Sequence, residues 1–552
     1  MANLKRKAST QAGADKNSKK AKNDSHKHQN ASKQDRKSQN RHSDMITEAK
    51  KIWETLRRGD ISREETKQLM DQIMGVIKGH VQEIIFKHDA SRIIQTCLKK
   101  GNAEQKNEIA GELAGKYLDL SKSMYGKFIA LKTLEYCPKQ RDQILSEYRT
   151  HIRRLIRHKE ASTVVEAFFA QFSNAAQRRE LLAEFYGPEM TLFNHGGGAK
   201  TLDELLKNLP EKKETVLKFM AETLTGCMDK GTVVHSIVHT ALYQYLTLAD
   251  DKGRQDMFAH LRDNVQDILH TREGSKVAIM LVSYASPKDR KHIVKNFKPY
   301  LTKIAEDQYG YLVLIRLLDV TDDTVLINKA VVSELLKNAQ KLFNDKYGRR
   351  VFLYILAGRN TKYLSPETVK QLKEADAYRN SKKDPEIRSK EILEGSSPLL
   401  IQAVAQHAST LLRESLSSQI VRETMLHAVG DKTAAINAIL DLCGESIEKD
   451  NHIMENPFGN RVIKAMVKAD SAEEANDRAT EPLNFAPKLL ERIKPNLAHF
   501  AANYGSFVVV ALLEEPSTKD EVAALLKPHM KEIKKAKEQN TAPGASILLE
   551  LL

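Results

Sequence analysis

Basic side chains recur at matching places along this chain, and their chemistry suits phosphate groups. Lys and Arg neutralise phosphates without contacting the bases, so these residues predict nucleic-acid binding that is largely independent of base sequence. A single surface Lys is ordinary, and it is the recurrence that favours a binding role. The residues concerned are Lys127, Lys276, Arg349, Arg350, Arg461 and Lys464, together with the grouped Arg153, Arg154 and Arg157.

Patterns typical of enzymes and metal sites are incomplete in this sequence. The segment 195–198, HGGG, resembles the oxyanion loop of esterases, but no GxSxG motif follows it, and it lacks the glycines of a phosphate-binding loop. His235 and His239 have a spacing that suits a shared metal ion, yet no Glu or third ligand accompanies them. We therefore predict no catalytic residue, no metal and no cofactor.

The elements that position the basic side chains form an internal repeat. The segment 307–318, DQYGYLVLIRLL, returns at 345–356 as DKYGRRVFLYIL, and weaker copies occur elsewhere. Such a period indicates a repeat protein, and the apolar run after each small residue predicts a helix buried by neighbouring repeats. Between units, Ser286-Pro287 predicts a helix N-cap followed by proline at the first helical position. The central small residues are Ala90, Gly126, Ala161, Gly198, Gly231, Gly274, Gly310 and Gly348.

The expected fold class is all-α, an α-α superhelix or solenoid of about ten or eleven helical units in two arms. In such a fold the length of the chain reflects the number of repeats rather than the number of separate hydrophobic cores. A charged stretch closed by a proline interrupts the period and predicts an exposed insertion or hinge. The expected parts are a disordered basic tail (1–44), a helical N-terminal cap (45–79), regular repeats (80–358), the insertion or hinge (359–395) and less regular repeats (396–552).

The N-terminal tail concentrates positive charge. The whole chain has a net charge of +15, which favours a polyanionic partner. Residues 1–44 contain twelve Lys or Arg against four Asp, with Leu4 as the single large aliphatic residue, so they cannot bury enough to order themselves. The clusters Lys5-Arg6-Lys7 and Lys19-Lys20 predict a nuclear-import and nucleic-acid-binding arm rather than only a solubilising extension.

Other sequence features bound the location of the protein. No apolar run reaches about 18 residues and no signal-peptide core is present, so we expect a soluble, intracellular protein without a membrane partner. Cys97, Cys137, Cys227 and Cys443 lie far apart and predict buried thiols in a reducing compartment.

Two units resemble the Pumilio-type (PUF) RNA-binding repeat. The segments 90–95, ASRIIQ, and 161–166, ASTVVE, each show a small residue, an edge residue, a stacking residue and a second edge residue three positions later. With more than eight units, a basic tail and an irregular C-terminal part, the chain is most similar to the divergent nucleolar branch of this family, the Puf-A branch. The resemblance covers about residues 80–550.

The resemblance implies roles for individual side chains. In PUF repeats one helix of each unit faces the RNA, two residues four apart contact a base edge, and the residue after the first stacks between bases. Aliphatic residues such as Ile279, Ile315 and Leu353 stand at the second edge position of other units and cannot hydrogen-bond a base, so a base-by-base code is not expected. The resemblance assigns base-edge or stacking roles to Ser91, Arg92, Gln95, Phe128, Ser162, Thr163, Glu166 and Phe507.

The resemblance also implies a function. We expect a largely sequence-independent RNA-binding scaffold of the nucleus and nucleolus, with DNA as an alternative polyanion, that acts as a monomer beside ribosome-assembly proteins in pre-ribosomal RNA processing and ribosome biogenesis. Two alternatives stay open: a sequence-specific mRNA-binding translational repressor, and an armadillo-like adaptor that binds an acidic protein in its groove. Ser91, Arg92 and Gln95 favour RNA, and the missing edge residues weigh against the repressor.

Overall fold

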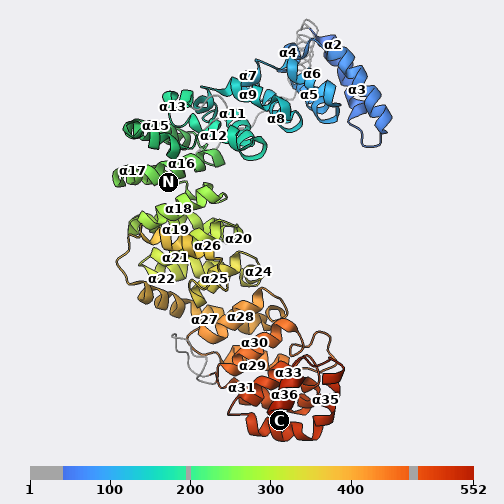
Figure 1. Ribbon diagram of the computed structural model, residues 1–552, viewed down its shortest axis with the longest axis vertical. Helices are drawn as coiled ribbons and strands as arrows, with labels where there is room; N and C mark the ends of the chain where they lie inside the picture. The colour runs from blue at the N-terminus through green and yellow to red at the C-terminus, as the bar shows by residue number, and fades with distance from the viewer. Residues whose placement is uncertain (1–41, 194–199, 471–482) are drawn as a thin grey trace, which may run out of the picture. The chain divides into compact units, whose positions relative to one another are not determined.

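The computed structural model describes residues 42–193, 200–470 and 483–552, which form helices and turns without any strand among them (Figure 1). Their contacts divide the chain between Ile237 and Val238 into two compact units, a boundary that lies inside the stretch predicted as regular repeats. The all-α repeat architecture is confirmed. Several predicted features lie outside the described residues, namely Lys5, Arg6, Lys7, Lys19, Lys20 and the 195–198 loop with Gly198.

In the first unit, one helix of each repeat packs against the corresponding helix of the next repeat. We call this succession of helices the inner row. Shorter helices that precede each inner-row helix cover its other side, and the apolar core lies between the two layers, as where α7 (Tyr117–Lys122) packs on α8. The inner row comprises α2 (Ser43–Leu56), α5 (His88–Lys100), α8 (Gly126–Tyr136) and α11 (Ala161–Ala167).

The second unit repeats this arrangement, with each inner-row helix packed on the next. Helix α16 (Ser236–Leu248) spans the division between the units and belongs to the same periodic series. The helices in order are α18 (Arg272–Tyr284), α21 (Gly310–Val320), α25 (Gly348–Ala357), α28 (Ser417–His427), α30 (Pro457–Lys468), α33 (Ser506–Glu514) and α36 (Ala545–Leu551) (Figure 1).

The recurring Asp-x-Tyr-Gly motif encodes the start of an inner-row helix. Asp307 Oδ1 accepts hydrogen bonds from the backbone N–H groups of Tyr309 and Gly310, both at 2.8 Å. A Cβ atom at Gly310 would lie 2.6 Å from the carbonyl oxygen of Ile304, so the close approach of the preceding helix requires glycine. The same cap recurs at Asp345 for Gly348 and at Asn456 for Gly459.

Three glutamates, of which Glu184 is buried, join successive repeats of the first unit. Glu112 accepts hydrogen bonds from the N–H groups of Gly79 at 2.8 Å and Val81 at 3.0 Å, one repeat earlier. Glu147 makes the same contacts one repeat further along the chain, again with the repeat before it. Glu184 accepts a hydrogen bond from the Thr150 N–H at 2.6 Å. Burial raises the pKa of Glu184 to about 7. These carboxylates set the spacing between repeats.

The expected insertion or hinge at 359–395 is instead a packed part of the second unit. It contains α26 (Pro366–Asp376) and the first half of α27 (Pro385–Leu411). Helix α26 packs along α18, and Arg388 of α27 is buried. The prediction of an exposed segment was wrong because its charged residues pair with buried groups of other helices. We call residues 366–388 the strap.

Other local predictions agree with the structure. Ser286 is the N-cap of α19 (Pro287–Phe297), and Pro287 occupies the first helical position. The four cysteines are buried and free. Among the residues that the structure describes, no helix is both long and apolar enough to span a membrane.

Candidate nucleic-acid interface

The inner-row helices set the register of the candidate interface. Helices α16 and α18 begin 36 residues apart, at Ser236 and Arg272, so Gly274 corresponds to Val238 and not to Gly231. The predicted register of that unit was wrong because the 43-residue interval between Gly231 and Gly274 hid an extended turn before the helix. Its edge and stacking positions hold His239, Thr240 and Tyr243.

The first edge position holds neighbouring repeats together. Ser91 is 1% exposed, and its Oγ donates a hydrogen bond to the carbonyl of Tyr125 in the next repeat at 2.9 Å. The same contact recurs between Ser275 and Tyr309 at 3.0 Å, and Asn460 donates to the Tyr504 carbonyl at 3.2 Å. This position therefore serves the backbone of the repeat stack.

The predicted edge residues are consequently less available than the sequence indicated. Gln95 Nε2 donates to Ser91 Oγ at 3.0 Å, so one Gln95 N–H is used within the repeat. Ser162 is buried, and the Glu166 carboxylate accepts from the Ile237 N–H at 3.3 Å. The next repeat covers the surface that a base edge would have to reach. The serines therefore lie inside the helix row. Thr163, at the stacking position, is exposed.

In the second unit, a cation at a stacking position, Lys276, and a cation at a second edge position, Lys464, pair with aromatic rings from the neighbouring repeat. The Lys276 ammonium lies 4.8 Å from the ring centre of Tyr243, and that of Lys464 lies 5.0 Å from the ring centre of Phe507. Such pairs present a positive charge and a π-face side by side, which suits a phosphate and an unstacked base.

Arg350 forms the most elaborate of these pairs. Its guanidinium lies 5.3 Å from the Tyr311 ring centre and 5.6 Å from that of Tyr347, while Nη1 donates to the Tyr311 hydroxyl at 2.9 Å. The two rings stack with centroids 5.7 Å apart. The hydrogen bond and the two rings fix the orientation of the guanidinium.

The first unit carries comparable pairs. Arg92 lies over the ring of Trp53 at 5.2 Å, and the exposed Phe128 ring has the Lys127 ammonium 5.0 Å from its centre. The sequence reasoning missed four aromatic residues of these pairs, which lie in the unit before the cation or beside it. A signal was present for Tyr311, because it stands at the first edge position after Gly310, whereas Tyr243 stands at an edge position only in the register that the structure shows. The missed residues are Trp53, Tyr243, Tyr311 and Tyr347.

Several residues predicted to bind phosphate hold the fold instead. Arg157 Nη2 donates to the carbonyls of Glu222 at 2.9 Å and Thr223 at 3.1 Å in α15 (Lys213–Asp229). Arg153 lies over the ring of Phe219 at 4.4 Å, also in α15. Nothing in the nearby sequence indicates these contacts of Arg153 and Arg157, because their partner helix lies more than sixty residues away. Arg154 is exposed.

Two further predicted cations have partners within the chain. Lys127 Nζ forms an ion pair with Glu160 at 2.6 Å. Arg349 donates to the Lys346 carbonyl at 2.8 Å, and burial lowers its pKa. Arg461, by contrast, is exposed on α30. The cations best placed for phosphate are therefore Arg92, Arg154, Lys276, Arg350, Arg461 and Lys464.

The strap occupies part of the inner-row face in the second unit. Ile279, at the second edge position of α18, lines the same 230 Å³ cavity as Ala375 and Tyr378 of the strap region. Arg272, at the start of α18, pairs with Glu367 at 2.7 Å. An aliphatic side chain at this edge position is thus explained by a protein neighbour that lies where a base would otherwise approach.

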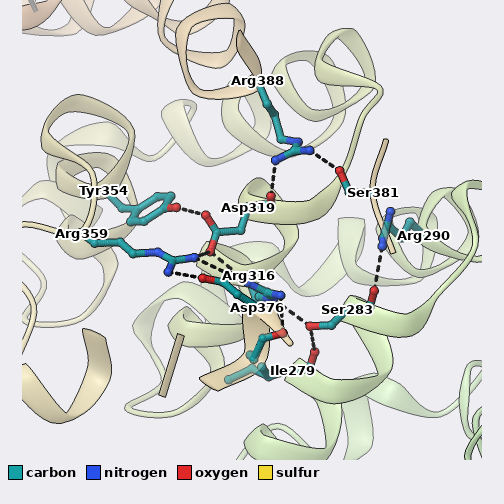
Figure 2. Close-up of polar contacts among 11 residues, drawn as sticks. Ile279, Ser283, Arg290, Arg316, Asp319, Tyr354, Arg359, Asp376, Ser381 and Arg388 are labelled. Atoms are coloured by element: carbon teal, nitrogen blue, oxygen red, sulfur yellow. Dashed lines mark hydrogen bonds and ion pairs between the residues drawn. The ribbon is translucent and has the colours of Figure 1, made fainter. Parts of the chain in front are cut away.

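A buried ionic network fastens the strap (Figure 2). Arg316, which is fully buried, donates to Asp376 at 2.6 Å, to Ser283 Oγ at 2.7 Å and to the Ala375 carbonyl at 2.7 Å. Arg359 donates to the same Asp376 carboxylate at 2.6 Å and 2.9 Å. Two arginines from two different segments therefore converge on one strap carboxylate.

The C-terminal end of the strap is held in the same way (Figure 2). Arg388 donates to the Asp319 carbonyl at 2.6 Å and to Asp322 at 3.0 Å, and Arg290 donates to the Asn380 carbonyl at 2.6 Å. Although burial alone would raise the pKa of Asp322, hydrogen bonds that include one from Arg388 lower it to about 2. Charge pairs thus fix the strap at its middle, at Asp376, and at its C-terminal end, at Arg388.

Matches to known proteins follow the repeat architecture. Residues 90–114 match the Pumilio-family RNA binding repeat, and residues 344–479 match the CPL (NUC119) domain. The chain is 35% identical over 538 residues to Pumilio homology domain family member 6 of Schizosaccharomyces pombe, a match that covers 96% of this chain and 83% of that protein. It is 34% identical over 520 residues to human Pumilio homolog 3, covering 92% and 79%.

Solved structures show the same similarity in three dimensions. The crystal structure of human Puf-A matches with a TM-score of 0.85 at 33% identity, covering 92% of this chain and 100% of that one. The crystal structure of human Puf-A in complex with DNA matches with a TM-score of 0.84 at 33% identity, covering 93% and 100%.

Proposed function

The chain belongs to the Pumilio family as a divergent PUF-repeat protein, and from this premise we propose that it is a scaffold that binds single-stranded RNA largely independently of base sequence. Phosphates contact the inner-row cations, and bases stack on the aromatic rings beside them. DNA binds through the same contacts, which agrees with the DNA complex of human Puf-A.

The cation–aromatic pairs are the observation that carries this proposal. Three of them, at Lys276, Arg350 and Lys464, recur on inner-row helices of the second unit. Phosphate contacts and stacking are both tolerant of sequence, because every nucleotide has a phosphate and a π-face. Buried edge residues leave few groups that distinguish one base from another.

The direct test removes the inner-row charges. Replacing Lys276, Arg350 and Lys464 with Ala should weaken binding to all single strands alike and reduce the slope of log affinity against log salt by roughly 0.7 per lost contact. The matched control replaces three exposed lysines of α35 (Met530–Glu538), which lies outside the inner row, and should leave the slope unchanged. The control residues are Lys534, Lys535 and Lys537.

Stacking is tested separately from charge. The Phe128 ring is 44% exposed, so Phe128→Ala removes a platform without opening the core. Base stacking contributes about 1–3 kcal/mol per base, and its loss should lower affinity without changing the salt slope. If the triple-charge variant and its control lose equal affinity, the inner row is not the binding surface.

Specificity follows from the same contacts. Affinities for unrelated single strands of equal length should lie within about tenfold, or 1.4 kcal/mol, of one another. A preference of about a thousandfold for one short motif would instead support the sequence-specific mRNA-binding repressor.

The cellular part of the proposal is a role in nucleolar pre-ribosomal RNA processing, beside ribosome-assembly proteins. It rests on the family branch and on the basic composition of residues 1–44. Crosslinking the protein to RNA in cells should yield reads dominated by ribosomal precursors. Reads confined to discrete sites in messenger 3′ regions contradict this role.

The basic tail supports a proposed nuclear and nucleolar location. Deleting residues 1–44, which hold Lys5-Arg6-Lys7 and Lys19-Lys20, should reduce nucleolar accumulation of a fluorescently tagged chain. A matched variant with Gln at those five positions should behave like the deletion. Unchanged accumulation of both variants shows that the signal lies elsewhere.

A further inference from the structure

Three potential metal ligands converge at the N-terminal end of the described chain. His42 Nε2 lies 2.7 Å from Glu83 Oε2, and His80 Nδ1 lies 3.1 Å from the same oxygen. All three donor atoms lie within 4.8 Å of one another. His42 precedes α2, whereas His80 and Glu83 belong to the start and body of α4 (Val81–Ile84), so two separate elements supply the cluster.

The backbone around these ligands is held by contacts of its own. The His42 carbonyl accepts a hydrogen bond from the Ile46 N–H at 3.1 Å at the start of α2. On either side of His80, the N–H groups of Gly79 and Val81 donate to the Glu112 carboxylate at 2.8 Å and 3.0 Å. Both imidazoles are half-buried, with ring centroids 5.4 Å apart. Fixed backbones on both sides favour a preorganised site.

We propose that His42, His80 and Glu83 bind a divalent transition-metal ion of the zinc type. Two imidazoles and a carboxylate are a donor set that zinc accepts, with a fourth position left for water. Bonds of about 2.0–2.1 Å place tetrahedral ligands about 3.3 Å apart. The nitrogen–oxygen distances of 2.7 Å and 3.1 Å would open slightly to reach that spacing, and all three donor atoms already lie within 4.8 Å of one another.

The ion fits the charge and the topology of the site. Without it, each imidazole donates a ring N–H to the shared carboxylate. When the ion binds, each neutral ring carries its proton on the other nitrogen and turns a lone pair towards the ion. It would link the cap helix α2 to α4 and so fix the point where residues 1–41 join the repeats. This role is independent of the RNA-binding proposal.

The test uses the full chain, stripped with a chelator and titrated with Zn²⁺ alone. Wild-type protein should bind one equivalent more than His80→Ala or Glu83→Gln, whose affinity at this site should fall by roughly a hundredfold or more. The matched control is His88→Ala, which removes a neighbouring, more exposed imidazole paired with Asp89, and it should keep the extra equivalent. The chain has 18 histidines, so the difference between variants carries the result.

Two further measurements separate coordination from adventitious binding. Co²⁺ bound to wild-type protein should give the intense visible absorption of a tetrahedral site, absent from both ligand variants. Zn²⁺ should raise the melting temperature of wild-type protein and of His88→Ala only. Glu83→Gln keeps the size of the side chain, so it remains informative if His80→Ala does not fold. Equal stoichiometry and equal cobalt spectra in wild type and Glu83→Gln overturn the proposal.

Discussion

Removal of the Asp376 carboxylate should release the strap. Asp376 accepts hydrogen bonds from Arg316 and Arg359, and Arg316 is fully buried. Breaking a buried ion pair typically costs about 3–5 kcal/mol because the remaining charge stays buried. Asp376 is 34% exposed, and Arg316 retains Asp319 at 3.3 Å, so solvent and the second carboxylate reduce the expected cost of Asp376→Ala to about 2 kcal/mol.

Hydrogen exchange measures this loss where it occurs. A loss of about 2 kcal/mol should accelerate exchange of the strap amides by roughly 30-fold, while amides of the first unit keep their protection. The matched control is Glu374→Ala on the same helix. Glu374 is 66% exposed and lies 3.9 Å from Lys370, so its removal should cost within about 0.5 kcal/mol.

Two outcomes would refute the reasoning about the strap. Strap exchange within about threefold of wild type in Asp376→Ala shows that the network does not hold it, and equal acceleration in Glu374→Ala shows that any charge change loosens α26. The released strap uncovers the aliphatic Ile279, so Asp376→Ala should gain no base preference. RNA binding assays on the same variant check that expectation.

Three further predictions concern stability. Gly310→Ala should lower the melting temperature and the stability of the fold by about 1–3 kcal/mol, because the new Cβ would lie 2.6 Å from a backbone carbonyl oxygen. At Gly75 a new Cβ meets no atom within 4 Å, so Gly75→Ala should stabilise the fold by up to about 1 kcal/mol. The raised pKa of Glu184 means that the folded protein keeps a proton there at pH values where the unfolded chain has lost it. The free energy of unfolding should therefore fall by about 3 kcal/mol as pH rises from 4.5 to about 7. Glu184→Gln should remove that pH dependence in urea titrations. The lowered pKa of Asp322 contributes roughly 2 kcal/mol of stability, which is present above pH 3.8 and is lost as pH falls through about 2. Acid unfolding of Asp322→Asn should lack this loss.

Features governed by short-range contacts could be predicted from the sequence. The start of several inner-row helices depends on a side chain and an N–H within three residues, as in Asp307 with Gly310, and the N-cap at Ser286 is equally local. The period of the repeat follows from the same local signals. The expectation that most units cannot read bases also follows directly from residue type, because an aliphatic side chain has no hydrogen-bonding group.

The tertiary structure alone decided which faces stay accessible. Arg316 and Asp376 are 60 residues apart, and nothing near either one indicates that the strap lies on α18. Likewise, Arg157 has its partners 65 and 66 residues away, so its sequence neighbourhood resembles a free phosphate-binding cluster. The same local pattern can place a side chain in a buried contact between helices or leave it exposed, because burial depends on a helix from a distant part of the chain that packs against it.

The same reason separates what was found from what was missed at the candidate sites. Lys276, Arg350 and Lys464 were recognised by charge and repeat position, both of which the sequence displays. The missed partners Tyr243, Tyr311 and Tyr347 and the His42–His80–Glu83 cluster depend on distances between residues of different repeats or elements. Sequence determines the chemistry that each position offers, and only the packing of one repeat on the next determines which of those groups meet.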